Sequence, residues 1–201
     1  RSVAFSPDGK LLATAAERVM LWDANNLTKI APLEYEAMPW SVDFSPDGRW
    51  LVSTHSDGTC LLWDVVQRER GSNFSQHSDA VHSVAVSADG RMIASGGEDR
   101  SIIIWDAEHK LKQTVLIGHN TRVMAAQFSP DGKWLISCDQ DGTMICWDIE
   151  QRRTRWTQEG TRQYPNYSVD VSDDGRWVAA SNGIYESSSG RRVIDSAQYA
   201  K

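Results

Sequence analysis

The stretch SVAVSADGRMIASGGEDRSIIIWD, residues 83–106, decides the fold of this chain. It opens with a short, half-apolar segment, Ser83 to Val86, and continues into the turn sequence Ser-Ala-Asp-Gly at 87–90. Serine and aspartate start such turns by bonding nearby backbone, and glycine accepts the left-handed conformation that closes them. Three further apolar segments follow, separated by turns: Met92–Ser95, the isoleucine-rich Ser101–Trp105 and a weaker Lys112–Leu116. The pattern predicts four strands joined by tight turns.

This unit recurs along the chain. The strings SVAFSPDG, SVDFSPDG, SVAVSADG, AAQFSPDG and SVDVSDDG begin at Ser2, Ser41, Ser83, Ala125 and Ser168. Their closing glycines are 39, 42, 42 and 43 residues apart. Trp-Asp pairs keep the same step, at 22–23, 63–64, 105–106 and 147–148. Two motifs that share one period predict a repeat protein.

The period, the Trp-Asp pairs and the Gly118-His119 pair before a strand resemble the WD40 family. The resemblance implies an all-β propeller of four-stranded antiparallel blades, with about five repeats in one region, 1–201. Units begin near residues 2, 41, 83, 125 and 168, and we expect the first and last to be incomplete. Such propellers usually have seven blades, so we interpret the chain as part of a larger ring. A second chain that completes the ring, or a closed five-bladed ring, are the other options.

Certain polar residues return at fixed places in the repeats. The resemblance implies that they bond in a chain, from Trp indole to Ser hydroxyl, from Ser to His, and from His to Asp. The expected members are His77, Ser95, Asp99 and Trp105 in the third unit, His119, Ser137, Asp141 and Trp147 in the fourth, and Ser53, Asp57 and Trp63 in the second, where Tyr35 replaces the histidine.

Serine, histidine and aspartate also form hydrolase triads. A catalytic set is needed once, whereas this set recurs at the same offsets, and each copy includes a tryptophan whose indole N–H needs a partner when buried. We therefore interpret the sets as structural. The first and fifth units lack the set: Ala180 stands at the serine position of the fifth, and Tyr185-Glu186 replaces Trp-Asp. We expect these two blades to be the least stable.

A second group of residues is predicted to bind a partner. In propellers that this chain resembles, the residue before each inner strand commonly lines the mouth of the central channel. Those positions are Arg1, Trp40, His82, Met124 and Tyr167, and neighbouring loops add Ser56, Glu98 and Gln140. The set is rich in Trp, Tyr, Met and Arg, which are residue types enriched at interfaces and hot spots. We hypothesise a peptide or protein ligand rich in apolar and cationic groups; the alternative is local packing of Trp40 and Tyr167 against Met38, Pro39 and Pro165.

Composition restricts the class of function. A net charge of −6 and a pI near 5.3 argue against nucleic acid and anionic membrane as partners, because both need dense Lys and Arg. No apolar run approaches the roughly 18–20 residues that span a bilayer. Cys60, Cys138 and Cys146 lack CxxC spacing, which indicates free thiols and a cytoplasmic location.

We therefore predict a non-catalytic interaction scaffold without a cofactor or a metal. No unit carries a cluster of carboxylates, histidines or metal ligands that its sister units lack. The alternative is a propeller-based enzyme, or a regulatory sensor domain fused to a catalytic domain outside this segment. The expected partners are a protein or peptide and, as a further option, more blades from the same or another chain.

Overall fold

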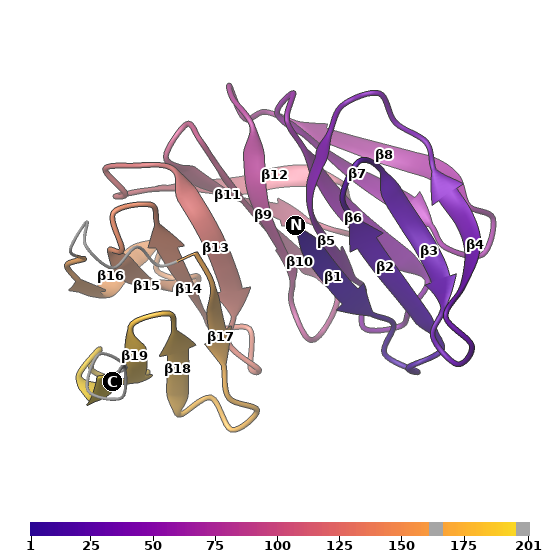
Figure 1. The fold of residues 1–201 in the computed structure, drawn as a ribbon. Helices are drawn as coiled ribbons and strands as arrows, with labels where there is room; N and C mark the ends of the chain where they lie inside the picture. Colours follow the sequence, from indigo (N-terminus) through magenta and orange to yellow (C-terminus); the bar gives the residue numbers. More distant parts are fainter. Residues whose placement is uncertain (161–166, 196–201) are drawn as a thin grey trace.

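A computed structural model of the chain describes residues 1–160 and 167–195, and within them the strands form five antiparallel four-stranded sheets (Figure 1). The first comprises β1 (Ser2–Phe5), β2 (Leu11–Ala15), β3 (Val19–Asp23) and β4 (Thr28–Leu33), and the second β5 (Pro39–Phe44), β6 (Trp50–His55), β7 (Thr59–Asp64) and β8 (Glu69–Ser75). The third comprises β9 (Val81–Val86), β10 (Met92–Gly97), β11 (Ser101–Asp106) and β12 (Leu111–Ile117). The fourth comprises β13 (Val123–Phe128), β14 (Trp134–Asp139), β15 (Met144–Asp148) and β16 (Arg153–Gln158), and the fifth β17 (Val169–Val171), β18 (Trp177–Ala180), β19 (Gly183–Glu186) and β20 (Arg192–Asp195).

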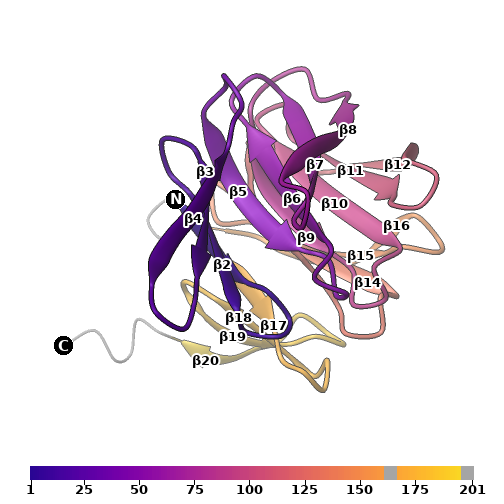
Figure 2. The same cartoon turned by 90° about the vertical axis from the view of Figure 1, so that its right-hand side faces the viewer.

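Each sheet is one propeller blade, and the predicted architecture is confirmed. The inner strands β1, β5, β9, β13 and β17 contact one another in that order, and Figure 2 shows β4, β8 and β12 at the periphery. The first and fifth blades are the ends of an open arc (Figure 1). Both have four strands, although the strands of the fifth are short. The described part of the chain holds no helix long and apolar enough to cross a membrane.

The hairpin between the first two strands closes in the same way in each blade. In the third blade the Ser87 hydroxyl donates to the Asp89 carboxylate at 2.6 Å and accepts the Met92 N–H at 2.9 Å. Gly90 then adopts a φ of 72°, in the left-handed region that glycine tolerates best. The same serine–aspartate bond joins Ser6 to Asp8, Ser45 to Asp47, Ser129 to Asp131 and Ser172 to Asp174. The turn motif therefore fixes where each inner strand ends.

The aspartate of each Trp-Asp pair caps the hairpin between the third and fourth strands. Asp64 Oδ1 accepts the N–H groups of Val66 and Gln67, at 3.0 and 2.9 Å. Five residues after the tryptophan, these hairpins place a residue with positive φ: Leu27, Arg68, Lys110 and Arg152, at 57, 60, 58 and 52°. The fifth blade has Gly190, at 70°, in the corresponding place. These four residues, none of them glycine, hold a left-handed backbone conformation that glycine adopts more readily.

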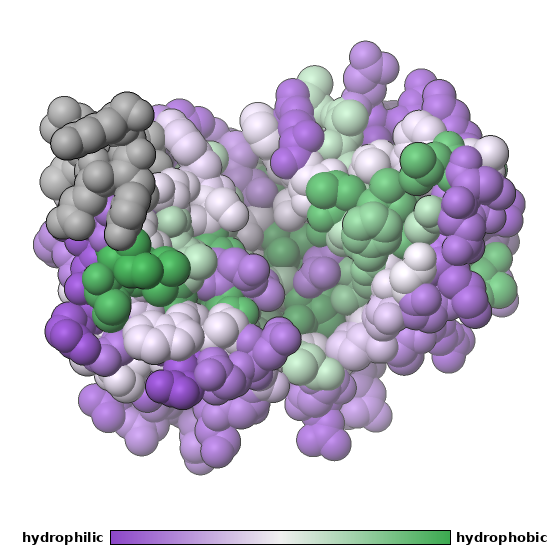
Figure 3. Space-filling view, turned by 60° about the horizontal axis from the view of Figure 1, so that its bottom comes forward, coloured by the Kyte–Doolittle hydropathy of each residue, from purple (hydrophilic) through white to green (hydrophobic). Residues whose placement is uncertain are grey.

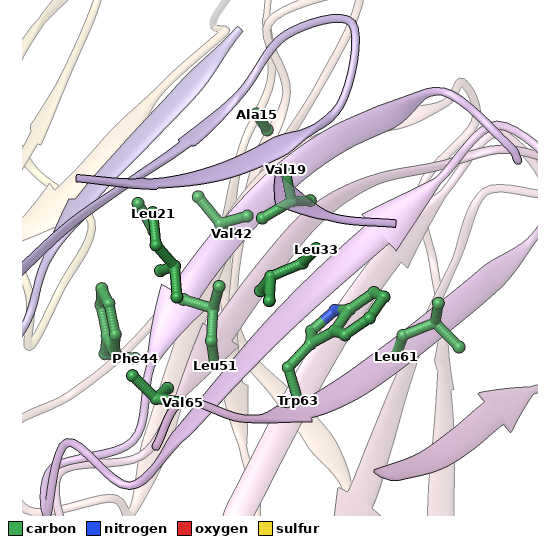
Figure 4. Close-up of a cluster of buried hydrophobic side chains, with 11 residues drawn as sticks. Ala15, Val19, Leu21, Leu33, Val42, Phe44, Leu51, Leu61, Trp63 and Val65 are labelled. Carbon is green, nitrogen blue, oxygen red and sulfur yellow. The ribbon is translucent and has the colours of Figure 1, made fainter. Parts of the chain in front are cut away.

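The blades pack face to face through apolar side chains. Between the first two blades, Val42, Phe44, Leu51 and Trp63 lie against Val19, Leu21 and Leu33 of the preceding blade (Figure 4). Burying a side chain of this kind stabilises the fold by about 1.5–3 kcal/mol. Similar clusters join the second blade to the third, the third to the fourth and the fourth to the fifth. The tryptophan-bearing face of a blade thus covers the blade before it.

At the ends of the arc the corresponding faces are open. Val3 and Phe5 of β1 are 61% and 63% exposed, whereas Val42 and Phe44, at the same positions of the second blade, are 4% and 6% exposed. On the fifth blade, a groove is lined by Ala179, Ile184, Val193 and Ile194, among others. Figure 3 shows hydrophobic side chains on both sides of the hollow between the two parts of the arc.

Candidate functional site

The third blade contains a fully connected polar network. Trp105 Nε1 donates to Ser95 Oγ at 2.9 Å, Ser95 Oγ lies 2.8 Å from His77 Nε2, and His77 Nδ1 lies 2.9 Å from Asp99 Oδ2. The structure therefore brings together the four residues expected here. The His77 side chain is 0% exposed, so no substrate in solvent reaches it. A Cβ at Gly97 would lie 2.8 Å from His77 Nδ1, which explains the glycine there.

The network of the fourth blade uses a different aspartate from the expected one. Trp147 Nε1 donates to Ser137 Oγ at 2.8 Å, and Ser137 Oγ lies 2.7 Å from His119 Nε2. His119 Nδ1 pairs with Asp139 Oδ2 at 3.1 Å, so the prediction of Asp141 in this role was wrong. Burial is the largest single influence and raises the pKa of Asp139, but the hydrogen bond and charge interaction with His119, together with the hydrogen bonds from Thr143 and Thr121, outweigh it and hold the pKa below its usual value. Asp141 instead donates its backbone N–H to Asp139 Oδ1.

The second blade recruits a histidine that the sequence analysis missed. Trp63 Nε1 donates to Ser53 Oγ at 2.7 Å, and Ser53 Oγ lies 2.8 Å from Nε2 of His55, on the same strand. The other ring nitrogen of His55 lies 3.1 Å from the Ala37 carbonyl. Tyr35, which stands in the usual histidine place, donates its hydroxyl to Asp57 at 2.8 Å. Ser53 and Asp57 thus belong to two adjacent groups of hydrogen bonds.

One position explains both departures. His55 and Asp139 each come two residues after the network serine, where the third blade has Gly97. A side chain there reaches the centre of the network, as the short distance from a Cβ of residue 97 to His77 shows. A polar residue in place of this glycine was the sequence signal that could have identified His55 and Asp139 as members of the networks.

The end blades keep only part of the pattern. In the first, Trp22 Nε1 donates to Thr14 Oγ1 at 3.0 Å. In the fifth, Tyr185 occupies the tryptophan position, is 1% exposed and donates its hydroxyl to Asn182 at 2.8 Å. Their lower stability remains a prediction.

The predicted binding residues meet at the channel mouth. Arg1, Trp40, His82, Met124 and Tyr167 line one cavity of about 410 Å³, together with inner-strand residues that include Asp43 and Gln127. Ser56, Glu98 and Gln140 are not among its lining residues. Tyr167 is 56% exposed. Of the alternative packing partners, Pro165 lies outside the described residues.

A chain of contacts crosses this mouth from the first blade to the fourth. The Arg1 guanidinium lies 4.1 Å from the centre of the Trp40 ring, and the Trp40 and His82 rings meet edge to face at 4.5 Å. His82 Nε2 lies 3.0 Å from Glu98 Oε1, which also pairs with Arg122 Nη1 at 2.7 Å. Arg122 Nε then donates to Gln140 at 2.7 Å. Arg122, which the sequence analysis missed, thus joins Glu98 to Gln140.

Two carboxylates at this mouth differ in environment. The hydrogen bond from His82, assisted by Arg122, holds the pKa of Glu98 below its usual value. Glu98 is therefore already paired, which weakens it as the group that attracts a cationic ligand. Asp43, in the cavity lining, accepts the Val86 N–H at 2.8 Å, and burial raises its pKa to about 6. Burial therefore makes ionisation of this carboxyl less favourable than it is in water.

Two polar atoms of the mouth have no hydrogen-bond partner among the described residues. They are Nε1 of Trp40 and Nδ1 of His82, both fully buried. The corresponding atoms of the network residues Trp105 and His77 are paired. Unpaired buried groups are uncommon in native proteins and call for an explanation. No group of three metal-ligating side chains occurs in residues 1–160 and 167–195.

Comparison with known proteins agrees with this architecture. The family "WD domain, G-beta repeat" matches residues 1–23, 35–64, 68–106 and 110–148. The chain is 36% identical over 83 residues to the target of rapamycin complex subunit LST8 of Saccharomyces cerevisiae, an alignment that covers 39% of this chain and 27% of that protein. It is 27% identical over 106 residues to a chromatin assembly factor 1 subunit of Gallus gallus, covering 41% and 19%.

A third relative is the meiotic recombination protein rec14 of Schizosaccharomyces pombe, 36% identical over 90 residues, covering 42% of this chain and 29% of that protein. The chain therefore spans less than a third of the length of each of these relatives. The family match covers more than half of the chain and includes the four Trp-Asp pairs. The chain belongs to the WD40 repeat family.

Proposed function

We propose that this chain is a non-catalytic scaffold that binds a protein or peptide at the channel mouth. The observation that carries the proposal is the meeting of Arg1, Trp40, His82, Met124 and Tyr167 around one cavity, from five different blades. Aromatic, methionine and arginine side chains in such a place are typical of interfaces. Two of the relatives are named as subunits, one of the target of rapamycin complex and one of chromatin assembly factor 1, which supports a role within an assembly.

The chemistry of the mouth supports a ligand with apolar and cationic groups. Arg1 already lies on the Trp40 ring, so that ring face accepts a cation. Met124 and the exposed Tyr167 supply apolar surface at the same cavity. Asp43 supplies a carboxylate in its lining.

The structural role of the serine–histidine–aspartate sets supports the non-catalytic part. Ser95 and Ser137 are both 0% exposed, and each hydroxyl already accepts an indole N–H. A nucleophile in such a position has no access to a substrate. The three cysteines are buried and form no disulfide within residues 1–160 and 167–195, and burial raises the pKa of each thiol to about 12. Cysteines outside disulfides suit the reducing cytoplasm, which we propose as the location.

The open ends of the arc support a larger ring. Val3 and Phe5 are exposed, whereas Val42 and Phe44, at the same positions of the second blade, are buried against the preceding blade. Exposed apolar faces of this kind favour association. We include in the proposal that further blades, from the same or another polypeptide, cover these faces.

The test of the binding role is partner capture by the double variant Trp40→Ala/Tyr167→Ala. Immobilised wild-type chain and variant are compared for the proteins that they retain, quantified by mass spectrometry. We expect the double variant to lose the partners that wild type retains. The matched control is Leu27→Ala/Val66→Ala. It removes exposed apolar side chains from the β3–β4 hairpin and the β7–β8 hairpin, which do not line the cavity. Equal capture by wild type and the channel-mouth variant would overturn the proposal.

A further inference from the structure

Trp40 and His82 form a pair in which each ring keeps one nitrogen without a partner among the described residues. The atoms are Trp40 Nε1 and His82 Nδ1. The two rings meet edge to face at 4.5 Å, and both residues line the channel-mouth cavity. The His82 side chain is only 4% exposed. Two unpaired polar atoms in one contact indicate a binding site that a further group completes.

The hydrogen-bonding role of each nitrogen follows from its surroundings. His82 Nε2 lies 3.0 Å from Oε1 of Glu98, and a carboxylate can only accept a hydrogen bond. The pKa of Glu98 is held low by its bond with His82 and by Arg122, so this carboxyl is ionised at neutral pH. A neutral His82 ring therefore carries its hydrogen on Nε2 and offers a lone pair at Nδ1. Trp40 Nε1 can only donate.

We propose that this pair binds an amide group of the partner. The amide carbonyl accepts the hydrogen of Trp40 Nε1, and the amide N–H donates to His82 Nδ1. An amide carries both functions, and proteins supply it either in the main chain or in Asn and Gln side chains. The inference rests on the proposed function and names the group that the partner presents to this part of the cavity.

The amide reaches the pair when a neighbouring side chain moves, because both nitrogens are buried in the structure. Arg1 is the candidate for this movement. It is exposed, and its guanidinium lies on the Trp40 ring at 4.1 Å. His82, by contrast, is held between Trp40 and Glu98.

The test is NMR titration of the ¹⁵N-labelled chain with small probes of defined hydrogen bonding. N-methylacetamide represents the main-chain amide, propionamide the side-chain amide, and methyl acetate is the control that can only accept. We expect one or both amides to shift the Trp40 indole N–H saturably, with a matching change at the His82 ring nitrogens. Methyl acetate should shift the indole N–H more weakly and leave the His82 ring nitrogens unchanged, because it has no N–H to donate. The stronger amide identifies the source. Absence of a saturable amide shift, an equal effect of the ester, or an indole that contacts only bound water would overturn the proposal.

Single variants make the assignment specific. Trp40→Phe keeps an aromatic ring beside Arg1 and His82 but removes the N–H. We expect it to weaken amide binding at least tenfold, measured at the His82 ring nitrogens, and to leave the urea midpoint of unfolding close to that of wild type. The matched control is Trp156→Phe, whose indole donates to the Ser187 carbonyl at 2.7 Å and lies outside this cavity. We expect that control to bind amides as wild type does. Wild-type amide binding by Trp40→Phe would contradict the proposal.

The two proposals fail separately. If the amides do not bind but Trp40→Ala/Tyr167→Ala still loses its partners, the binding role stands and the amide inference falls. If the amides bind but partner capture is unchanged in the double variant, the site exists and the proposed role is wrong.

Discussion

The networks inside the blades and the channel mouth contain the same kinds of side chain but differ in how completely they are paired. In the third blade Trp105, Ser95 and His77 satisfy one another within the protein. At the channel mouth Trp40 and His82 each keep an unpaired nitrogen. A satisfied buried network stabilises and rigidifies the fold. The difference indicates that the first region serves the fold and that the second is shaped for a partner.

The largest expected effect comes from breaking a network at Asp139. Asp139→Ala removes the partner of His119 Nδ1 and the acceptor of the Asp141 and Thr143 N–H groups, in a place where both side chains of the pair are 1% exposed. We expect a loss of about 2–4 kcal/mol in the free energy of unfolding, measured in urea at pH 7. Asp141→Ala, the matched control, should cost clearly less. An equal cost for the two would show that the network is assigned to the wrong carboxylate.

The same comparison has a pH dependence. Because the pKa of Asp139 is held below its unfolded value, its contribution is present above about pH 4 and is lost as the pH falls through the lower, folded pKa. The difference in the free energy of unfolding between wild type and Asp139→Ala should therefore become smaller at acidic pH.

The second largest expected effect is an increase in the free energy of unfolding, and it concerns Asp43 in the channel. Burial raises the pKa of Asp43 from 3.8 to about 6, so ionisation of this carboxyl weakens the fold as the pH rises through that interval. Asp43→Asn keeps an oxygen for the Val86 N–H and removes the charge. Because Asp43 is half-buried, we expect the variant to be about 1–3 kcal/mol more stable than wild type at pH 8 and equal to it near pH 3.5.

The control for this effect is Asp47→Asn, in an exposed turn. The hydroxyl of Ser45 holds the pKa of Asp47 below its usual value, so its substitution should lower stability at pH 8. Urea midpoints at the two pH values check both variants. A stability of Asp43→Asn that does not vary with pH relative to wild type would contradict the account of Asp43.

Much of the fold could be predicted from the sequence because its signals are local. The Ser-x-Asp-Gly turns and the Trp-Asp pairs each act within one hairpin, so their spacing alone places the blades. The network of the third blade follows the repeated offsets for the same reason. The repeated spacing of the network residues could not identify Asp139 and His55. Both lie two residues after the network serine, which is not one of the positions at which the repeat places a histidine or an aspartate. Arg122 was missed because its partners come from two different blades, which only the folded arc brings together.

The smallest effect concerns the hairpins between the third and fourth strands. Lys110 holds a φ of 58°, whereas the fifth blade has Gly190 in the corresponding place. We expect Lys110→Gly to be neutral or to stabilise by less than about 1 kcal/mol, because relief of the left-handed strain opposes the entropy of glycine in the unfolded chain. Gly190→Ala should destabilise, since its Cβ would lie 2.6 Å from the Trp156 ring. Thermal unfolding of the two variants compares them, and a marked loss in Lys110→Gly would argue against strain at this position.

The most direct test of the division between fold and recognition is the free energy of unfolding of Trp40→Ala/Tyr167→Ala beside that of Asp139→Ala. If Trp40 and Tyr167 serve binding, the double variant stays within about 1.5 kcal/mol of wild type in urea while it loses partner capture. Asp139→Ala shows the larger loss of stability. A double variant as unstable as Asp139→Ala would contradict the account, because Trp40 and Tyr167 would then be parts of the fold rather than of a binding site.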